Sequence, residues 1–266
     1  MSGAGESGAK VGSLRVLSGA VAGEGGESGA ALPISETFTS IQGEGKLAGV
    51  PSHFIRVSGC NLRCTWCDTP YASWRPEATV VAVDALVTGA AASGVRHAVL
   101  TGGEPMLFAG VLELSRRLRA SGMHVTVETA GTVFHGPEVL ACDLMSISPK
   151  LSNSTPAEGD ARDPGGVWRA RHEERRINVQ VLQRLIDASP QRQLKFVVSG
   201  PGDLDEVEAL LARLTGWAPD DVLLMPEGVV VPAQERTSWM VSACIERGWR
   251  FCPRLHIQVF GNRRGT

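Results

Sequence analysis

Short apolar runs alternate along this chain with longer amphipathic stretches. The runs are bounded by turn residues and indicate buried β-strands, whereas the amphipathic stretches indicate helices. Strands are expected at residues 52–57, 97–101, 124–128, 143–148, 193–198 and 221–225. Helices are expected at residues 80–92, 107–121, 177–188, 204–214 and 233–247. This alternation predicts βαβ units on a parallel sheet with right-handed crossovers.

Six strand–helix repeats fall short of the eight that close a complete barrel. The sequence therefore predicts an α/β fold, an open, partial TIM-like (β/α)6 barrel. In such folds the ligand site lies at the carboxyl ends of the strands.

Residues 1–32 differ in composition from the rest, being rich in Gly, Ala and Ser with few large apolar side chains. Such a segment cannot bury enough surface to offset its ordering entropy. We expect a disordered N-terminal extension over 1–32 and one folded domain over 33–266.

Charge and cysteine usage narrow the class of protein. The 26 Lys and Arg are balanced by 28 Asp and Glu, so no basic field indicates a nucleic-acid partner or a membrane surface. Six cysteines, three of them in one motif, are typical of a reduced cytoplasmic compartment rather than a disulfide framework. The sequence shows neither a signal peptide nor an apolar run of about 20 residues that could span a membrane.

The strongest chemical signal is the motif C-x3-C-x2-C formed by Cys60, Cys64 and Cys67. Thiolates suit both iron-sulfur clusters and zinc. A structural zinc needs a fourth ligand, and neither His nor Cys follows within twenty residues. Three thiolates on a four-iron cluster leave one iron open for catalysis. A zinc site, a purely redox cluster and three unrelated core thiols are the alternatives.

Other segments with candidate ligand-binding residues also follow predicted strands. Gly102 and Gly103 come directly after the strand 97–101, and without Cβ atoms their backbone can approach a ligand. A tight turn is the structural alternative. Segments 128–132 and 148–150 follow the next two strands.

The cysteine motif resembles the signature of the radical S-adenosylmethionine (SAM) superfamily, C-x3-C-x-aromatic-C, with Trp66 before the last cysteine. The resemblance implies that the open iron binds SAM, and that reduction of the cluster yields a 5'-deoxyadenosyl radical. Segment 102–105 resembles the GGEP motif, whose backbone and carboxylate would receive the SAM amino group.

Further segments resemble the 7-carboxy-7-deazaguanine synthase (QueE) family, and the likeness extends from about residue 33 to the C-terminus except for 152–176. These segments are 40–45, 54–56, 59–64, 67–72, 127–132, 147–150, 194–198, 255–256 and 261–265. The resemblance implies conversion of 6-carboxy-5,6,7,8-tetrahydropterin to 7-carboxy-7-deazaguanine with loss of ammonia, a step of 7-deazapurine and queuosine biosynthesis. SAM would be regenerated. Mg²⁺, a flavodoxin- or ferredoxin-type reductant and a homodimer are also implied.

The family match assigns expected roles to individual residues, none of them a side-chain acid or base. The substrate would contact Ile41, Gln42, Gly43, Arg56 and Thr101. SAM would contact Trp66, Cys67, Asp68, Gly103, Glu128, Ser148, Pro149 and Lys150. Cys60, Cys64 and Cys67 would hold the 4Fe-4S cluster, and Thr69 would bind Mg²⁺, a hard ion that prefers oxygen.

Arg56 would pair with the substrate carboxylate, because a planar guanidinium can bind it through two hydrogen bonds. A solvated strand arginine is the alternative. Lys195 would bind either the SAM or the substrate carboxylate, or serve in a salt bridge.

Several features have structural interpretations. Cys142, Cys244 and Cys252 are expected to pack in the core rather than to hold a second cluster. The arginine-rich segment 162–176 is expected to be a solvated loop and helix start, with a mobile lid as the alternative. His256 lies either in the core or near the active-site mouth.

Two other functions stay open from the sequence. A radical SAM activase that places a glycyl radical on a partner protein would share the cysteine loop. It would not be expected to share segments 41–45, 68–69 and 261–265 as well. A non-enzymatic iron-sulfur or zinc module is the other possibility.

Overall fold

The computed structural model describes residues 29–136 and 141–266. The expected N-terminal extension therefore lies outside the described residues except for its last four positions. Of these, Ala31 and Leu32 already belong to the first strand, and Leu32 is buried.

The described residues form one nine-stranded sheet in the order β3-β1-β2-β4-β5-β6-β7-β8-β9. Neighbouring strands are parallel throughout the series β2-β4-β5-β6-β7-β8-β9. Strand β1 runs antiparallel to both of its neighbours, β2 and β3. The two edges, β3 and β9, do not pair, so the sheet stays open. The strands are β1 (Ala31–Ile41), β2 (Pro51–Val57), β3 (Thr79–Ala82), β4 (His97–Gly102), β5 (His124–Thr129), β6 (Leu144–Ile147), β7 (Arg192–Val198), β8 (Val222–Pro226) and β9 (Arg250–Phe251).

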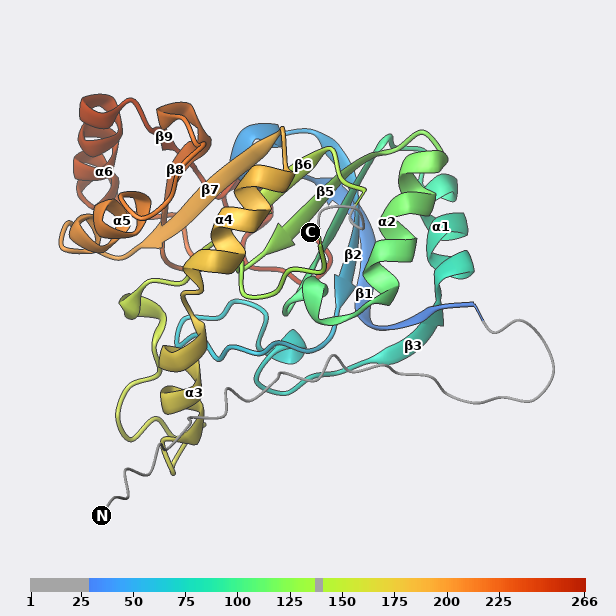
Figure 1. The fold of residues 1–266 in the computed structure, drawn as a ribbon, viewed down its shortest axis with the longest axis horizontal. Helices are drawn as coiled ribbons and strands as arrows, with labels where there is room; N and C mark the ends of the chain where they lie inside the picture. Colours follow the sequence, from blue (N-terminus) through green and yellow to red (C-terminus); the bar gives the residue numbers. More distant parts are fainter. Residues whose placement is uncertain (1–28, 137–140) are drawn as a thin grey trace, which may run out of the picture.

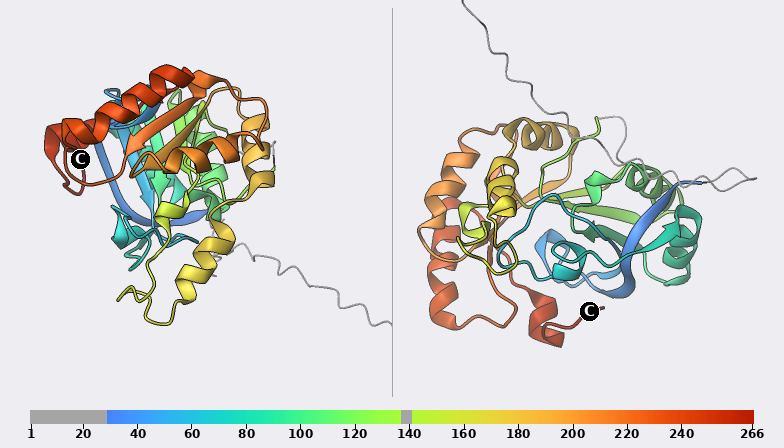
Figure 2. Two further views of the ribbon diagram at one scale, coloured as in Figure 1. Left: turned by 90° about the vertical axis from the view of Figure 1, so that its left-hand side faces the viewer. Right: turned by 90° about the horizontal axis from the view of Figure 1, so that it is seen from below.

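Most helices connect parallel strands and lie on the outer side of the curved sheet, while α3 extends below it and α7 follows the last strand (Figures 1 and 2). The α-helices of the described residues are α1 (Val83–Ala92), α2 (Gly110–Ala120), α3 (Val167–Arg175), α4 (Val179–Ala188), α5 (Asp203–Leu211), α6 (Gln234–Arg247) and α7 (Leu255–Phe260). Short 3-10 turns are η1 (Gly45–Leu47), η2 (Pro70–Ala72), η3 (Pro105–Leu107), η4 (Ser152–Ser154) and η5 (Pro219–Asp221). None of these helices is long and apolar enough to cross a membrane.

All six strands expected from the sequence are present, and the prediction of an open α/β barrel is confirmed. The expected helix 80–92 is wrong at its start, because residues 79–82 form β3 and the helix begins at Val83. The β-branched Val80 and Val81 pair with Pro33 and Leu32 of β1 instead. The helix expected at 107–121 begins at Gly110, after the turn η3.

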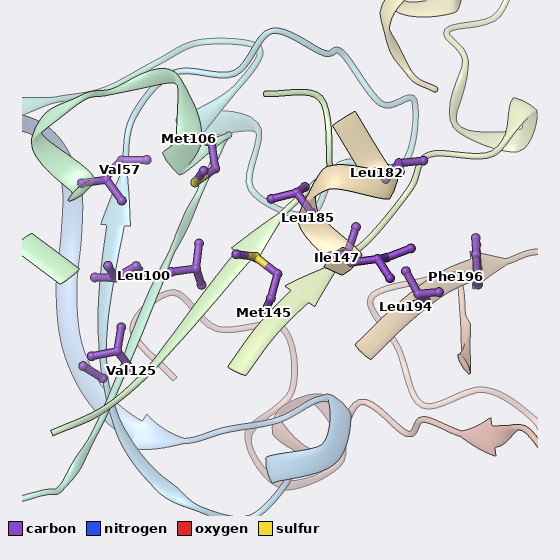
Figure 3. Close-up of a cluster of buried hydrophobic side chains, with 14 of the residues drawn as sticks. Val57, Leu100, Met106, Val125, Met145, Ile147, Leu182, Leu185, Leu194 and Phe196 are labelled. Carbon is purple, nitrogen blue, oxygen red and sulfur yellow. The ribbon is translucent and has the colours of Figure 1, made fainter. Parts of the chain in front are cut away.

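Alternation along the strands separates a packed outer face from an inner face that is mostly polar on β2, β4, β5 and β6 and partly apolar on β7 and β8. Outward residues such as Leu100, Val125, Met145, Leu194 and Phe196 belong to one buried apolar cluster (Figure 3). Helix residues complete this cluster, among them Leu114 of α2 and Leu182 and Leu185 of α4. Since successive strand residues point to opposite faces, the neighbours of these core residues must point into the barrel.

The turn that follows β1 fills part of the barrel interior. The backbone N–H of Lys46 donates to Gln193 Oε1 at 2.7 Å, and the N–H of Gly45 donates to Cys252 Sγ at 3.0 Å. Gly45 has a φ of 78°, and a Cβ at this position would lie 2.3 Å from Gln193 Nε2. Only glycine lets the turn pack this closely against β7.

Candidate functional site

The carboxyl-terminal halves of the parallel strands surround a cavity of about 560 Å³. Its walls include Arg56 of β2, Thr101 of β4, Glu128 of β5 and Lys195 of β7. Each of these residues neighbours an outward-facing core residue, for example Leu100 before Thr101 and Val127 before Glu128. Strand alternation therefore places four polar side chains from distant parts of the chain in one cavity.

The cysteine loop, residues 60–67, forms another wall of the same cavity. Cys60, Cys64 and Cys67 all line it, and all three are free thiols. The loop lies beside the carboxyl ends of β2 and β4, because Gly59 N donates to Ala72 O and Glu104 N donates to Gly59 O. Asn61 holds the loop to the end of β5 by donating from Nδ2 to Thr132 Oγ1 at 3.0 Å.

Burial makes the thiolate forms of these cysteines costly in the absence of a cation. Burial raises the pKa of Cys60 to about 12 and raises that of Cys64 further, and the neighbouring thiolates add to both shifts. A bound cation or cluster would offset this cost, because it deprotonates its thiol ligands. In the described residues, no three His, Cys, Asp or Glu side chains converge as ligands of a single metal ion. The donor set of three thiols on one cavity wall is compatible with an iron-sulfur cluster, because soft thiolates are its usual ligands.

The glycine pair at the end of β4 allows the cysteine loop to approach the strand. Gly102 has a φ of 140°, and a Cβ there would lie 2.2 Å from Val57 O. A Cβ on Gly103 would lie 2.2 Å from Gly59 O and 2.6 Å from Ala72 O. A side chain at position 102 would therefore push β4 away from β2, and one at position 103 would push the start of the cysteine loop away from β4.

The carboxylate of Glu104 does not line the cavity, contrary to the SAM contact expected from the GGEP resemblance. It is fully buried and accepts hydrogen bonds from Met106 N, Ala130 N and Thr129 Oγ1. Burial raises the pKa of Glu104 although these three donors favour its charged form. Glu104 therefore fastens the end of β4 to the end of β5.

A carboxylate orients Arg56 within the cavity. Arg56 Nε donates to Glu36 Oε1 at 2.7 Å, and Tyr71 OH donates to the same oxygen at 2.9 Å. Burial alone would lower the pKa of Arg56, but Tyr71 and Glu36 raise it. Since the bond to Glu36 uses Nε, the two terminal nitrogens can meet a ligand carboxylate.

A network of hydrogen bonds fixes the cavity side of β5. Glu128 accepts from Thr101 Oγ1 at 2.9 Å and from Gln42 Nε2 at 3.2 Å. Gln42 belongs to the turn after β1, and its neighbour Gly43 lies against His256, whose Nδ1 would be 1.9 Å from an added Cβ. The geometry thus joins Gln42, Thr101 and Glu128 in one hydrogen-bonded group.

Opposite charges are paired on the other side of the cavity. Glu44 forms ion pairs with Lys195 and with Arg254, and Arg254 also pairs with Asp68. Burial alone would raise the pKa of Glu44, but Lys195 and Arg254 lower it well below its usual range. Lys195 is therefore engaged in a salt bridge, one of the interpretations left open by the sequence.

The segment after β6 brings Ser148 and Lys150 to the cavity. Lys150 Nζ donates to Ser148 O and to Ser148 Oγ, each at 2.8 Å, and lies 5.9 Å from the centre of the Trp66 ring. Pro149 is buried and does not line the cavity, unlike the other residues expected to contact SAM. Pro149 restricts the backbone of the turn that directs Ser148 and Lys150 toward the cavity.

The remaining expected site residues lie around the same cavity. Ile41, Gly43, Asp68, Gly103 and Thr69 all line it. Thr69 precedes the turn η2, and its Oγ1 lies 3.8 Å from Cys67 Sγ. The structure thus brings the expected ligand-contacting residues to one cavity, with the exceptions of Pro149 and Glu104.

The structure also shows the surroundings of His256, of the other three cysteines and of segment 162–176. His256 lines the cavity, as one of its two interpretations required. Cys244 and Cys252 are buried, and Cys142 packs against the main apolar cluster. Segment 162–176 does not line the cavity, which does not support a lid, whereas most of its residues are exposed and α3 begins at Val167, as expected for a solvated loop and helix start. It packs on the far side of the cysteine loop, through Arg162, Trp168 and His172.

Sequence reasoning assigned no role to several cavity residues. Glu36 and Tyr71 orient Arg56, and Arg254 joins Glu44 to Asp68. The C-terminal residues Asn262, Arg263, Arg264, Gly265 and Thr266 also line the cavity. Glu44 and the tail could have been recognised as site residues from the sequence, because they lie in the family-like segments 40–45 and 261–265.

Comparisons with known proteins agree with this geometry. The family model "Radical SAM superfamily" matches residues 54–145, from β2 to β6, including the cysteine loop. The 7-carboxy-7-deazaguanine synthase of Rhodopirellula baltica is 48% identical over 240 residues, which cover 90% of this chain and 90% of that protein. The enzyme of the same name from Halobacterium salinarum is 45% identical over 249 residues, covering 91% of this chain and 95% of its own.

A solved structure shows the same fold. The crystal structure of QueE from Escherichia coli aligns with a TM-score of 0.63 at 27% sequence identity. The alignment covers 85% of this chain and 95% of that one.

Proposed function

This chain belongs to the 7-carboxy-7-deazaguanine synthase family, and we propose that its cavity converts 6-carboxy-5,6,7,8-tetrahydropterin to 7-carboxy-7-deazaguanine with loss of ammonia. The chain is a radical SAM enzyme of 7-deazapurine biosynthesis and a carbon-nitrogen lyase. One observation carries the substrate assignment: three cysteines and an oriented arginine line the same cavity in a chain 48% identical to a synthase of that name.

In this proposal Cys60, Cys64 and Cys67 would hold a 4Fe-4S cluster, and SAM would bind beside it. Together these groups supply the one-electron chemistry that starts and ends the ring contraction. The protein positions the reactants and excludes water. Trp66 packs against Val197 and Met225 at the inner face of β7 and β8, which keeps this wall of the cavity apolar.

Arg56 binds the substrate carboxylate through its two terminal nitrogens, which a guanidinium can do in a planar, bidentate geometry. The hydrogen-bonded group of Gln42, Thr101 and Glu128 faces the polar edge of the pterin ring. Ile41 and Gly43 add backbone contacts from the turn after β1. The support for these roles is the shared cavity and the orientation of Arg56 by Glu36.

SAM lies between the cysteine loop and the ends of β4 to β6 in this proposal. Its polar groups would meet Asp68, the Gly103 backbone, Ser148 and Lys150, and Pro149 would shape the last turn. Glu128 stands where both ligands would meet, since it shares the cavity with the cysteine loop and with Arg56.

Thr69 is proposed as a ligand of Mg²⁺. A hydroxyl oxygen suits this hard ion, which completes its shell with water and substrate oxygens. Support comes from the place of Thr69 on the cavity wall beside Cys67. The electron donor is proposed to be a flavodoxin- or ferredoxin-type protein, the assembly a homodimer and the compartment the cytoplasm.

The decisive experiment is anaerobic incubation of the reconstituted protein with SAM, dithionite, Mg²⁺ and 6-carboxy-5,6,7,8-tetrahydropterin. Mass analysis is expected to show 7-carboxy-7-deazaguanine formed without net consumption of SAM. Protein that binds no iron, or whose cluster spectrum SAM does not change, would support a non-enzymatic module instead. Cluster and SAM binding without product would exclude the pterin as substrate and leave a glycyl-radical activase open.

A further inference from the structure

The cysteine loop has no regular secondary structure from Cys60 to Cys64, yet several of its backbone polar groups have hydrogen-bond partners. Many of these partners lie on residues 151–176, a segment that we call the bracket. The bracket includes η4 and α3 and does not line the cavity. It therefore acts on the loop from the side opposite to the ligand (Figure 1, where α3 lies below the sheet).

The first set of contacts holds the middle of the loop. Thr65 N donates to Ser154 O at 2.7 Å, and Thr65 O accepts from Arg162 Nη2 at 3.1 Å. Trp66 Nε1 donates to Asn153 O at 3.0 Å. Both polar groups of the Thr65 backbone thus point away from the cavity.

The second set acts through Arg63, whose side chain is folded back under the loop. Its Nη1 donates to Cys60 O and to Leu62 O, each at 2.7 Å, and its guanidinium lies 3.9 Å from the centre of the Trp168 ring. Arg63 is only 7% exposed, so the bracket buries this cation against an aromatic face. The arginine belongs to the scaffold of the loop and not to the cavity.

His172 binds the loop backbone between Cys60 and Cys64. It is fully buried, and its Nδ1 accepts the backbone N–H of Arg63 at 3.1 Å. Because Nδ1 accepts, Nε2 carries the proton and donates to Ser154 Oγ at 2.9 Å. Ser154 Oγ in turn donates to Leu151 O. Both ring nitrogens are satisfied only by a neutral imidazole in one tautomer.

The direction of the Arg63 amide matters because this residue lies between two cluster ligands, Cys60 and Cys64. Backbone amides that donate to cluster sulfurs stabilise the reduced state and raise the reduction potential. In this loop Leu62 N already donates to Cys60 Sγ at 3.4 Å. The amides of Arg63 and Thr65, in contrast, are bound by the bracket.

We propose that His172 is a positioning residue that holds the Arg63 amide away from the cluster sulfurs and thereby keeps the reduction potential of the cluster low. The inference rests on the proposed function, since it requires a cluster on this loop. A low potential is useful here, because the reduced cluster must be a strong enough reductant to cleave SAM.

The test compares three substitutions of His172 in the full-length, reconstituted protein. His172→Asn keeps an acceptor at the position of Nδ1, His172→Gln keeps a polar atom near the position of Nε2, and His172→Phe keeps only the ring shape. The potential is measured by anaerobic titration followed by electron paramagnetic resonance (EPR), without substrate. We expect a wild-type potential and spectrum for Asn, and a shift to more positive potential for Gln and Phe.

Hydrogen exchange provides a second measurement that needs no cluster. In the protein as purified, peptides covering residues 60–67 should exchange at least about tenfold faster in His172→Phe than in wild type, with His172→Asn close to wild type. If His172→Phe takes up too little iron for EPR, hydrogen exchange still tests whether His172 holds the loop. The reduction potentials are then compared between the Asn and Gln variants.

The outcomes separate the two proposals. Wild-type protein that holds no iron contradicts the proposed function, whatever the exchange data show. If wild type carries a cluster but all variants share its potential and exchange rates, the role of His172 is wrong. The same conclusion follows if Asn behaves like Phe, because His172 would then act by packing alone.

Discussion

Glu36 and Glu104 both support the cavity, but only the carboxylate of Glu36 lies in its wall. Glu36 lies beside Arg56 and Tyr71 and aims the guanidinium into the cavity. Glu104 is turned away from the cavity and ties the ends of β4 and β5 together. The role of a carboxylate in a family-like motif thus has to be inferred from its hydrogen-bond partners. Glu104 matches the GGEP pattern, yet both its oxygens accept hydrogen bonds from neighbouring residues of the fold.

Arg56→Lys tests the carboxylate clamp. Lysine keeps the positive charge but cannot form two parallel hydrogen bonds, and it also loses the Nε bond to Glu36. We expect the KM for the carboxypterin to rise about tenfold, which corresponds to the loss of roughly one charge-assisted hydrogen bond. Initial rates at varied substrate check this, and the affinity for SAM serves as the control. A wild-type KM would exclude the clamp.

Glu104→Gln separates a scaffold role from a SAM contact. The amide nitrogen of glutamine would face a donor, because both Glu104 oxygens accept hydrogen bonds from backbone N–H groups and Thr129. We expect the free energy of unfolding to fall by about 1–3 kcal/mol. Urea unfolding of the two proteins measures the change. Unchanged stability with loss of SAM binding would contradict the scaffold role.

Among the secondary-structure elements, the C-terminal tail after α7 closes the cavity on the side of Arg56. Residues 262–266 line the cavity, and Arg264 is their anchor. Arg264 pairs with Glu36 at 3.2 Å and with Glu77 at 3.0 Å, and its guanidinium lies 4.1 Å from the Tyr71 ring centre. The same Glu36 therefore orients Arg56 and holds the tail.

Arg264→Ala should loosen this tail without unfolding the domain. Since the ion pairs of Arg264 are exposed, their loss is expected to raise the KM for the carboxypterin only about two- to fivefold. The thermal midpoint should stay at the wild-type value. Arg116→Ala, which removes an exposed ion pair on α2, is the matched control and should change neither quantity. Equal effects in the two variants would show that the tail has no part in binding.

Across the whole molecule, the parallel strands and the cysteine loop could be predicted from the sequence because their signals are local. Buried strands such as Leu194 to Val198 are continuous apolar runs, interrupted only by the inward Lys195. Strand β1 could not be found in this way, since its buried residues Leu32 and Ile34 are separated by Pro33 and followed by polar residues. Its place depends on pairing with β2 and β3.

The parts of the site that escaped prediction depend on contacts between distant residues. Arg264 and Glu36 are 228 positions apart, and Arg254 and Glu44 are 210 apart. The arginine-rich segment 162–176 carries too little apolar surface to indicate where it packs. Its position follows from Trp168 and His172, which meet the cysteine loop more than 100 residues away.

The barrel interior is built in two layers, and the lower one consists of hydrogen-bonded polar side chains. Two to four residues before Arg56, Thr101 and Glu128, the same strands carry Ser52, His97 and Thr126 on the inner face. His97 Nδ1 lies 2.6 Å from Ser52 Oγ, and its Nε2 lies 2.8 Å from Thr126 Oγ1. These hydrogen bonds join β2, β4 and β5, and none of the three residues lines the cavity.

This lower layer predicts a pH dependence of folding. Burial lowers the pKa of His97 to about 4 from the ordinary value of 6.5. Between these two values the unfolded chain binds the proton and the folded protein does not, so stability is full above pH 6.5 and falls as the pH falls. The contribution of His97 to the slope is up to about 1.4 kcal/mol per pH unit.

Urea unfolding at pH 7, 6 and 5 measures this slope, and His97→Gln is expected to flatten it while lowering stability at pH 7. Ser52→Ala is the control: it removes one hydrogen bond but leaves the imidazole buried, so it should lower stability equally at each pH. A slope in His97→Gln as steep as in wild type would assign the acid sensitivity to other groups. Because the lower layer does not line the cavity, neither variant should alter the KM for SAM or for the carboxypterin at pH 7.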